Sequence, residues 1–124
     1  MKKVLIVDDH ADIRRLVRLT LEFEDVEVRE AAEGSSALKM LDGWRPDALL
    51  VDLMMPGMDG LALCRAVRAR SDTHDLPVVF LTARGQAQDR DDGLKAGANA
   101  YLLKPFSPLQ LIQELGRVSA GAGA

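Results

Sequence analysis

Four short and unbroken apolar runs, separated by longer segments of mixed polarity, constrain the fold of this chain more than any other feature. The runs cover residues 4–7, 48–51, 78–81 and, interrupted only by a tyrosine hydroxyl, 100–103. Strands that are apolar at every position are typical of parallel sheets, in which helices cover both faces. Residues 26–30 alternate between apolar and charged side chains instead, which predicts an edge strand.

The segments between these strands carry helix signals. Apolar residues at helical spacing predict helices over residues 13–21, 36–41 and 61–70, and a mostly polar helix over residues 86–96. Asp59 is placed to cap the third helix, and Ser107, Pro108 and Gln110 predict the capped start of a last one. Because strands and helices alternate five times, we expect an α/β three-layer sandwich with right-handed crossovers.

The length of the chain suits one domain. We place that domain at residues 1–118 of the 124, and we interpret the small residues 119–124 as a flexible tail or linker stub. The net charge of −3 argues against direct nucleic-acid binding. The single cysteine, Cys64, excludes an internal disulfide and fits a reducing compartment, so we expect a cytoplasmic protein.

Neither a secretion signal nor a membrane segment is expected. The apolar run that follows Lys2 and Lys3 is shorter than the roughly 7–15 residues of a signal peptide. No run approaches the ~18 apolar residues of a membrane-spanning helix.

Each of the four apolar runs is followed directly by a polar residue. Asp8 and Asp9 follow the first run, and Asp52, Thr82 and Lys104 follow the others. Parallel strands place their carboxyl ends along one edge of the sheet, where ligands bind in open α/β folds. A lone aspartate or Lys-Pro after a strand is usually a turn former. Turns do not explain five such residues at four strand ends, so we expect three carboxylates, a hydroxyl and an amine to converge on one site.

These groups together favour phosphoryl chemistry. Three clustered carboxylates repel one another and raise one another's pKa unless a cation lies between them. Oxygen ligands suit Mg²⁺, whereas zinc would require histidine or cysteine. With Lys104 as a second cation and the Thr82 hydroxyl nearby, a phosphoryl group would find partners for its oxygens. Aspartate carboxylates accept phosphoryl groups covalently, so Asp52 is the candidate nucleophile.

Four motifs of this chain resemble those of the receiver domain of bacterial two-component response regulators. They are VDDH, PDALLVDLMMPGMDG, FLTARG and GANAYLLKPFSP, in that order, and the resemblance covers roughly residues 3–118. It implies a flavodoxin-like (βα)5 sandwich whose five-stranded parallel sheet has the order 2-1-3-4-5. It also implies a phosphoacceptor switch that does not turn over an external substrate.

The resemblance assigns roles to the acidic residues. It implies that Asp52 accepts a phosphoryl group from a histidine kinase or phosphotransfer protein. It implies that Asp8 and Asp9 hold Mg²⁺ together with Asp52 and the backbone carbonyl of Met54. A downstream output domain or protein would then receive the signal.

The resemblance also implies a relay. Thr82 and Lys104 would contact the phosphoryl oxygens, and the Lys104–Pro105 peptide bond would be cis. Tyr101 would be the switch residue, moving inward when Thr82 is drawn to the phosphoryl group.

Two side chains are expected to set the lifetime of the phosphorylated state. Met54 lies two residues past the acceptor, and Arg84 lies two residues past Thr82. Neither can act as a base toward water, and Met54 is apolar while Arg84 is long enough to lie across the site. We therefore predict slow loss of the phosphoryl group.

Some positions depart from the pattern of DNA-binding regulators. Asn99 and Ala100 replace an acidic pair, and the last helix has Leu109, Gln110 and Leu111 at positions that are often charged. These departures argue against a charge-paired dimer and for a monomer or weak dimer. His10 and His74 have no partners at ligand spacing and are interpreted as surface residues. Cys64 lies on an apolar helix stripe and is interpreted as core packing.

The sequence argues against three other functions. A phosphatase with an aspartyl nucleophile would need a second aspartate where Met54 stands. A flavin-binding module would need a phosphate-cradling first loop, whereas VDDHAD would repel phosphate. A degenerate receiver acting only as a scaffold would lack site residues, and all five are present.

Overall fold

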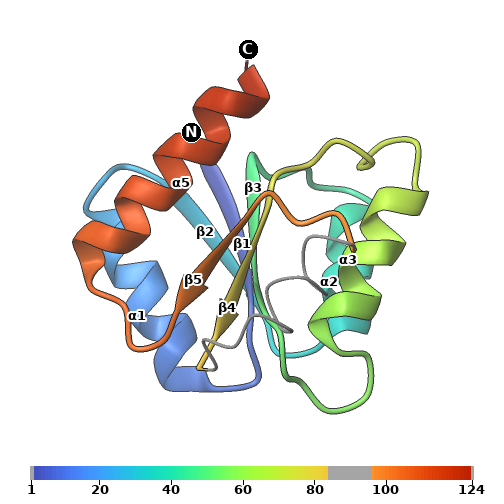
Figure 1. Ribbon diagram of the computed structural model, residues 1–124, viewed down its shortest axis with the longest axis horizontal. Helices are drawn as coiled ribbons and strands as arrows, with labels where there is room; N and C mark the ends of the chain where they lie inside the picture. The colour runs from blue at the N-terminus through green and yellow to red at the C-terminus, as the bar shows by residue number, and fades with distance from the viewer. Residues whose placement is uncertain (1, 84–95, 124) are drawn as a thin grey trace.

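The computed structural model describes residues 2–83 and 96–123, with side chains described as far as Val118 (Figure 1). Its strands are β1 (Lys3–Val7), β2 (Glu27–Ala31), β3 (Ala48–Asp52), β4 (Val78–Thr82) and β5 (Ala100–Leu103). Its helices are α1 (Ala11–Glu22), α2 (Gly34–Leu41), α3 (Gly60–Ala69) and α5 (Pro108–Gly123). The helix predicted at residues 86–96 lies almost entirely outside the described residues.

All strand pairs are parallel, and the strand order is β2-β1-β3-β4-β5. The expected flavodoxin-like α/β sandwich is therefore confirmed. Helices α1 and α5 cover one face of the sheet, and α2 and α3 cover the other (Figure 1). None of the helices in the described part of the chain is both long and apolar enough to span a bilayer.

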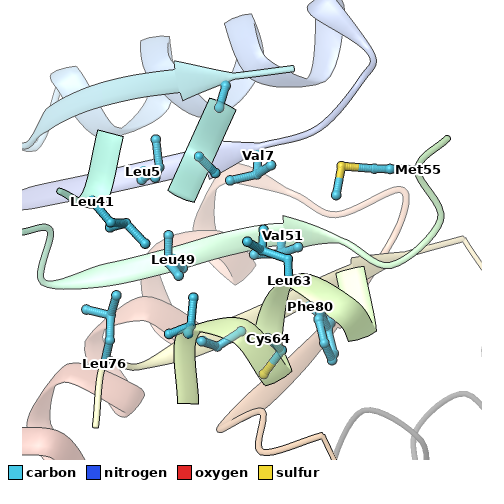
Figure 2. Close-up of a cluster of buried hydrophobic side chains, with 14 of the residues drawn as sticks. Leu5, Val7, Leu41, Leu49, Val51, Met55, Leu63, Cys64, Leu76 and Phe80 are labelled. Atoms are coloured by element: carbon cyan, nitrogen blue, oxygen red, sulfur yellow. The ribbon is translucent and has the colours of Figure 1, made fainter. Parts of the chain in front are cut away.

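Each face of the sheet has its own apolar core, because successive side chains of a strand point to opposite faces. On the α2 and α3 side, Leu63 and Cys64 of α3 pack with Val51 and Phe80 of the sheet (Figure 2). On the other side, the buried residues are Val4, Ile6, Leu50, Val79 and Leu81 of the sheet, Val17 and Leu21 of α1, and Leu111 and Leu115 of α5. This two-sided burial explains why the central strands are apolar at every position.

The two edge strands differ from the central ones. Strand β2 alternates between exposed and buried residues from Glu27 to Arg29, as its sequence predicts, and ends with the partly buried Glu30 and the buried Ala31. Strand β5 was expected to be buried throughout, but Leu103 is 43% exposed. The reason is that β5 has a neighbour on one side only. In α1, Leu16 has the helical spacing of a core residue but is 39% exposed, because Val17 and Leu21 make the contact with the sheet.

The predicted helix starts are confirmed. The Asp59 side chain accepts a hydrogen bond from the Ala62 amide at 2.8 Å. At α5, the Ser107 hydroxyl accepts from the Gln110 amide at 3.1 Å, and Gln110 Oε1 accepts from the Ser107 amide at 2.8 Å. Helix α5 continues to Gly123. The division of the chain at residue 118 stays a prediction.

Helix α3 fixes the turn that leads into β5. The Arg68 guanidinium donates to the Gly97 carbonyl at 2.7 and 3.0 Å, to the Leu76 carbonyl at 2.6 Å and to Asn99 Oδ1 at 2.9 Å. One turn earlier in α3, the Cys64 thiol donates to the Ala96 carbonyl at 3.2 Å. The thiol is 1% exposed, which confirms the core interpretation of Cys64.

The loops at the amino edge of the sheet are joined by contacts of their own. Arg70 Nη2 lies 2.9 Å from Asp42 Oδ1, and Arg45 Nη2 lies 3.0 Å from Asp75 Oδ1. The Arg29 guanidinium lies over the Trp44 ring, 4.5 Å from its centroid. These contacts are remote from the carboxyl edge, where the polar strand ends meet.

Candidate functional site

The five polar residues at the strand ends do meet at the carboxyl edge. Asp8, Asp52 and Thr82 are 0%, 3% and 1% exposed, although all three are polar. Asp52 and Thr82 line an open pocket of about 220 Å³. Its lining consists of His10, Asp52, Met54, Thr82, Ala83 and Lys104. Such a cluster of buried polar groups needs partners, because an unpaired buried charge is strongly unfavourable.

Asp8, which follows β1, is held from several sides. Its Oδ2 lies 2.9 Å from Lys104 Nζ, and its Oδ1 accepts a hydrogen bond from the His10 amide at 2.9 Å. Its backbone carbonyl accepts from Arg14 at 2.6 Å, and Arg14 is paired with Glu30 at 3.0 Å. The carboxylate of Asp8 is therefore paired and fixed in orientation.

Asp52 is the last residue of β3, and its side chain is 5% exposed. Its Oδ1 accepts a hydrogen bond from the Met54 amide at 3.2 Å and lies 3.7 Å from Lys104 Nζ. Burial and then the charge of Asp8 raise the pKa of Asp52 to about 6, against the opposing effects of Lys104 and the Met54 amide. At neutral pH the carboxylate is still mainly ionised, so it can act as a nucleophile.

The loop after Asp52 folds tightly because of two glycines. Gly57 has a positive φ of 73°, which favours glycine. A Cβ atom on Gly60 would lie only 2.5 Å from the Asp52 carbonyl oxygen. The absence of a side chain at Gly60 therefore lets α3 begin directly against the end of β3, and the PGMDG segment keeps Asp52 in place.

Thr82 and Tyr101 lie on the same face of the sheet. Tyr101 of β5 is in register with Phe80 of β4, and Thr82 is two residues further along β4. Residues two apart in a strand share a face, so Tyr101 is a diagonal neighbour of Thr82. Tyr101 is partly buried against the core on the α2 and α3 side. The amide of Lys104 donates to the Thr82 carbonyl at 2.7 Å, and the Lys104–Pro105 bond is cis, as predicted.

His10 lies at the surface, as interpreted, but the expectation that it has no partners is wrong. Its Nδ1 lies 2.9 Å from Asp8 Oδ1, 3.3 Å from Asp9 Oδ1 and 3.8 Å from Asp52 Oδ2. The hydrogen bond with Asp8, and then the charges of Asp9 and Asp8, raise the pKa of His10. The ring is 59% exposed, so His10 is both a surface residue and a neighbour of the three carboxylates. His74 is exposed as expected, with its Nδ1 3.0 Å from the Ser71 carbonyl oxygen.

Of the two side chains expected to control phosphoryl lifetime, one is described. Met54 is 58% exposed and lines the pocket beside Asp52. Arg84 lies outside the described residues.

The acidic residues fit a divalent cation. Asp8, Asp9, His10 and Asp52 each offer one ligand atom, and these atoms all lie within 4.8 Å of one another. Carboxylate oxygens are the ligands that Mg²⁺ prefers, usually with several waters kept. The donor set therefore fits the magnesium ion expected from the sequence.

A doubly wound parallel sheet with buried carboxylates beside an open pocket at its carboxyl edge defines a CheY-like class of signalling domain. The model of the response regulator receiver domain matches residues 4–116, so this chain belongs to the response regulator receiver domain family of two-component signal transduction.

The similarity extends to full-length regulators and to solved structures. The chain is 43% identical over 110 residues to the transcriptional regulatory protein ResD of Bacillus subtilis (strain 168), covering 89% of this chain and 45% of ResD. It thus spans about half the length of the curated relatives it matches. A putative response regulator from Chloroflexus aurantiacus J-10-fl has a TM-score of 0.92 at 40% identity, covering 96% of this chain and 98% of that one.

A third comparison concerns the metal. The receiver domain of the sensor histidine kinase PA1611 from Pseudomonas aeruginosa PAO1 has a TM-score of 0.88 at 31% identity, covering 96% of this chain and 98% of its own. That structure holds a magnesium ion coordinated in the active site cleft.

Proposed function

We propose that this chain is a phosphoacceptor switch in which Asp52 takes a phosphoryl group from a histidine kinase or phosphotransfer protein. The observation that carries the proposal is the buried Asp52 carboxylate in the pocket, with Lys104 Nζ 3.7 Å away and Thr82 in the pocket lining. Membership in the receiver family supports the same assignment. The role is one of signalling, without turnover of an external substrate.

The transfer is an in-line displacement at phosphorus. An Asp52 carboxylate oxygen forms the new O–P bond while the P–N bond to the donor histidine breaks. The bonding electron pair leaves with the imidazole, which takes up a proton. Lys104 neutralises charge on the phosphoryl oxygens, and the Thr82 hydroxyl donates a hydrogen bond to one of them.

Mg²⁺ would be held by Asp8, Asp9 and Asp52 together with the Met54 backbone carbonyl. When bound, it supplies positive charge against the carboxylates and the incoming phosphoryl group. Asp8 also positions Lys104, whose Nζ lies 2.9 Å from Asp8 Oδ2 and 3.7 Å from Oδ1 of the acceptor Asp52.

The signal leaves the site through Thr82 and Tyr101. Once the Thr82 hydroxyl is drawn to the phosphoryl group, it vacates space on the face that it shares with Tyr101. Tyr101 then moves inward and changes the surface of β5 that a downstream domain or protein contacts. The partly buried position of Tyr101 and its diagonal register with Thr82 support this relay.

We propose that the chain is a monomer or weak dimer. Asn99 supports this, because its Oδ1 is already used within the chain by the Arg68 side chain and by the Val78 amide, at 2.9 Å each. Asn99 and Ala100 are also both uncharged, so they provide no acidic pair for a charge-matched partner.

An intact-mass measurement tests the acceptor. After incubation with a small phosphodonor and Mg²⁺, the wild type should gain one phosphoryl group and Asp52→Asn none. Asp12→Asn is a matched control, since Asp12 is an exposed carboxylate at the start of α1. Labelling of Asp52→Asn to the wild-type yield would overturn the assignment. A chelator should abolish labelling, and an unchanged rate would contradict the role of Mg²⁺.

A further inference from the structure

The His10 ring gives the acidic site a nitrogen donor that a purely oxygen-ligated magnesium site does not need. Its Nδ1 faces three carboxylates that come from two strand ends, at 2.9 Å from Asp8, 3.3 Å from Asp9 and 3.8 Å from Asp52. Because Nδ1 lies this close to all three carboxylates, we count His10 with them as one group of potential metal ligands.

These distances match the spacing of ligands around one ion. In octahedral coordination at about 2.1 Å, adjacent ligand atoms are about 3.0 Å apart and opposite ones about 4.2 Å. The separations of His10 Nδ1 from the three carboxylate oxygens fall between or close to these two values. An ion could therefore contact the ring nitrogen and the carboxylates together.

The backbone already holds His10 in place. It is the residue before α1, with an extended backbone at φ −94° and ψ 112°, and its amide donates to Asp8 Oδ1 at 2.9 Å. The side chain makes no capping hydrogen bond to α1. The contact that the imidazole makes in the site is the hydrogen bond between its Nδ1 and Asp8 Oδ1 at 2.9 Å, and a metal ion bound through Nδ1 would take the place of that bond.

Imidazole nitrogen changes which ions a carboxylate site prefers. Mg²⁺ takes oxygen ligands, whereas Co²⁺, Ni²⁺ and Zn²⁺ bind imidazole well and rank above the early first-row ions in affinity. We propose that His10 is a fourth metal ligand, through Nδ1, and that it gives the site a preference for late first-row divalent ions over Mg²⁺. The inference rests on the metal site of the proposed function and adds the ligand that sets its selectivity.

Calorimetric titration of the untagged chain tests the inference without any phosphodonor. Ni²⁺ and Mg²⁺ are titrated separately at about pH 8, above the ordinary pKa of histidine, into wild type, His10→Ala and His74→Ala. We expect His10→Ala to lower Ni²⁺ affinity about tenfold or more and to leave Mg²⁺ affinity within about twofold. His74→Ala controls for the other histidine of the chain, and it should bind both ions as the wild type does.

The visible spectrum of bound Co²⁺ gives a second readout. Loss of a nitrogen ligand should shift the ligand-field bands of the His10→Ala complex, while His74→Ala should keep the wild-type spectrum. Ni²⁺ affinity and Co²⁺ bands that are unchanged in His10→Ala would overturn the role of His10, as would an equal loss in His74→Ala. Mg²⁺ affinity retained in His10→Ala shows that the pocket is folded. Failure of the wild type to bind Mg²⁺ would instead count against the proposed function.

Discussion

Lys104 Nζ lies 2.9 Å from Asp8 Oδ2 across the carboxyl edge of the sheet, although 96 positions separate the two residues in the chain. The Asp8 side chain is 0% exposed and that of Lys104 is 15% exposed. Both charges are therefore largely removed from water, and each depends on the other. Removing one partner of such a pair leaves an uncompensated buried charge, which is strongly destabilising.

Lys104→Met should accordingly lower the free energy of unfolding by roughly 3–5 kcal/mol in the absence of divalent ions. Added Mg²⁺ should restore part of the loss, since it binds the folded state beside the same carboxylate. Urea unfolding with and without Mg²⁺ measures both effects. Lys39→Met is the control, because Lys39 is exposed on α2, and it should change stability little. Equal stability of the two variants would mean that Asp8 does not need Lys104.

Asp52 should make the stability of the metal-free protein depend on pH. Its pKa is raised to about 6 in the folded state, so the folded protein binds the Asp52 proton more tightly than the unfolded chain does. The favourable contribution is complete below the ordinary pKa near 4 and is lost as the pH rises through about 6. Asp52→Asn should therefore match the wild type at low pH and exceed its stability by about 3 kcal/mol at pH 7.

Urea unfolding of both proteins between about pH 4 and 8 in a chelator follows this difference. Asp12→Asn, which removes an exposed carboxylate at the start of α1, is the control. The rate of phosphoryl labelling should also decline below about pH 6, because only the ionised carboxylate attacks. A stability gap that is constant across this range would contradict the raised pKa.

Gly60 and Gly116 should respond to alanine with opposite signs. A Cβ at Gly60 would lie 2.5 Å from the Asp52 carbonyl oxygen and 2.9 Å from Leu53 Cα, both backbone atoms. Gly60→Ala should cost about 1–3 kcal/mol and slow labelling of Asp52 by displacing it. A Cβ at Gly116 would meet no atom within 4 Å, so Gly116→Ala in α5 should add about 0.5–1 kcal/mol. Chemical unfolding measures the stability of both variants, and a lower free energy of unfolding in both would contradict the prediction of opposite signs.

Arg68→Ala should loosen the turn before β5. The substitution removes every hydrogen bond from the guanidinium to the Gly97 and Leu76 carbonyls and to Asn99. We expect a loss of about 2–3 kcal/mol, with faster amide hydrogen exchange at Asn99 and in β5. Arg65→Ala, an exposed arginine on the same helix, is the matched control. Unchanged exchange in β5 would show that α3 does not hold this turn.

The phosphorylated protein should lose its phosphoryl group slowly, and Met54→Ala should speed the loss. Met54 is apolar and lines the pocket, so it should obstruct the approach of water opposite the Asp52 oxygen. Arg84→Ala is expected to act in the same direction. The decay of the isolated phosphoprotein measures both, with Leu109→Ala as a control at an exposed apolar residue of α5. Equal or slower decay in both variants would mean that neither residue guards the bond.

The sequence was sufficient for the sheet and for the five polar strand ends, because hydrophobic period and strand polarity are local patterns. The sequence was insufficient where a side chain could point either into the site or to solvent. His10 at a helix start can point to solvent or to the preceding carboxylates, and its side-chain rotamer, which the sequence does not reveal, decides between them. The one available signal was its position directly after Asp8 and Asp9. Leu103 was misjudged for a different reason, since it was judged from its apolar run alone, whereas the expected strand order 2-1-3-4-5 already placed this strand at an edge of the sheet.

Trp44 gives the molecule a built-in optical reporter. It is the only tryptophan and lies in the loop that enters β3, at the opposite end of that strand from Asp52, with the Arg29 guanidinium 4.5 Å from its ring centroid. Its emission will therefore follow loss of the packed amino edge and should be insensitive to what fills the pocket. A substitution at the carboxyl edge that abolishes phosphorylation yet keeps the native emission spectrum has damaged the chemistry and spared the fold.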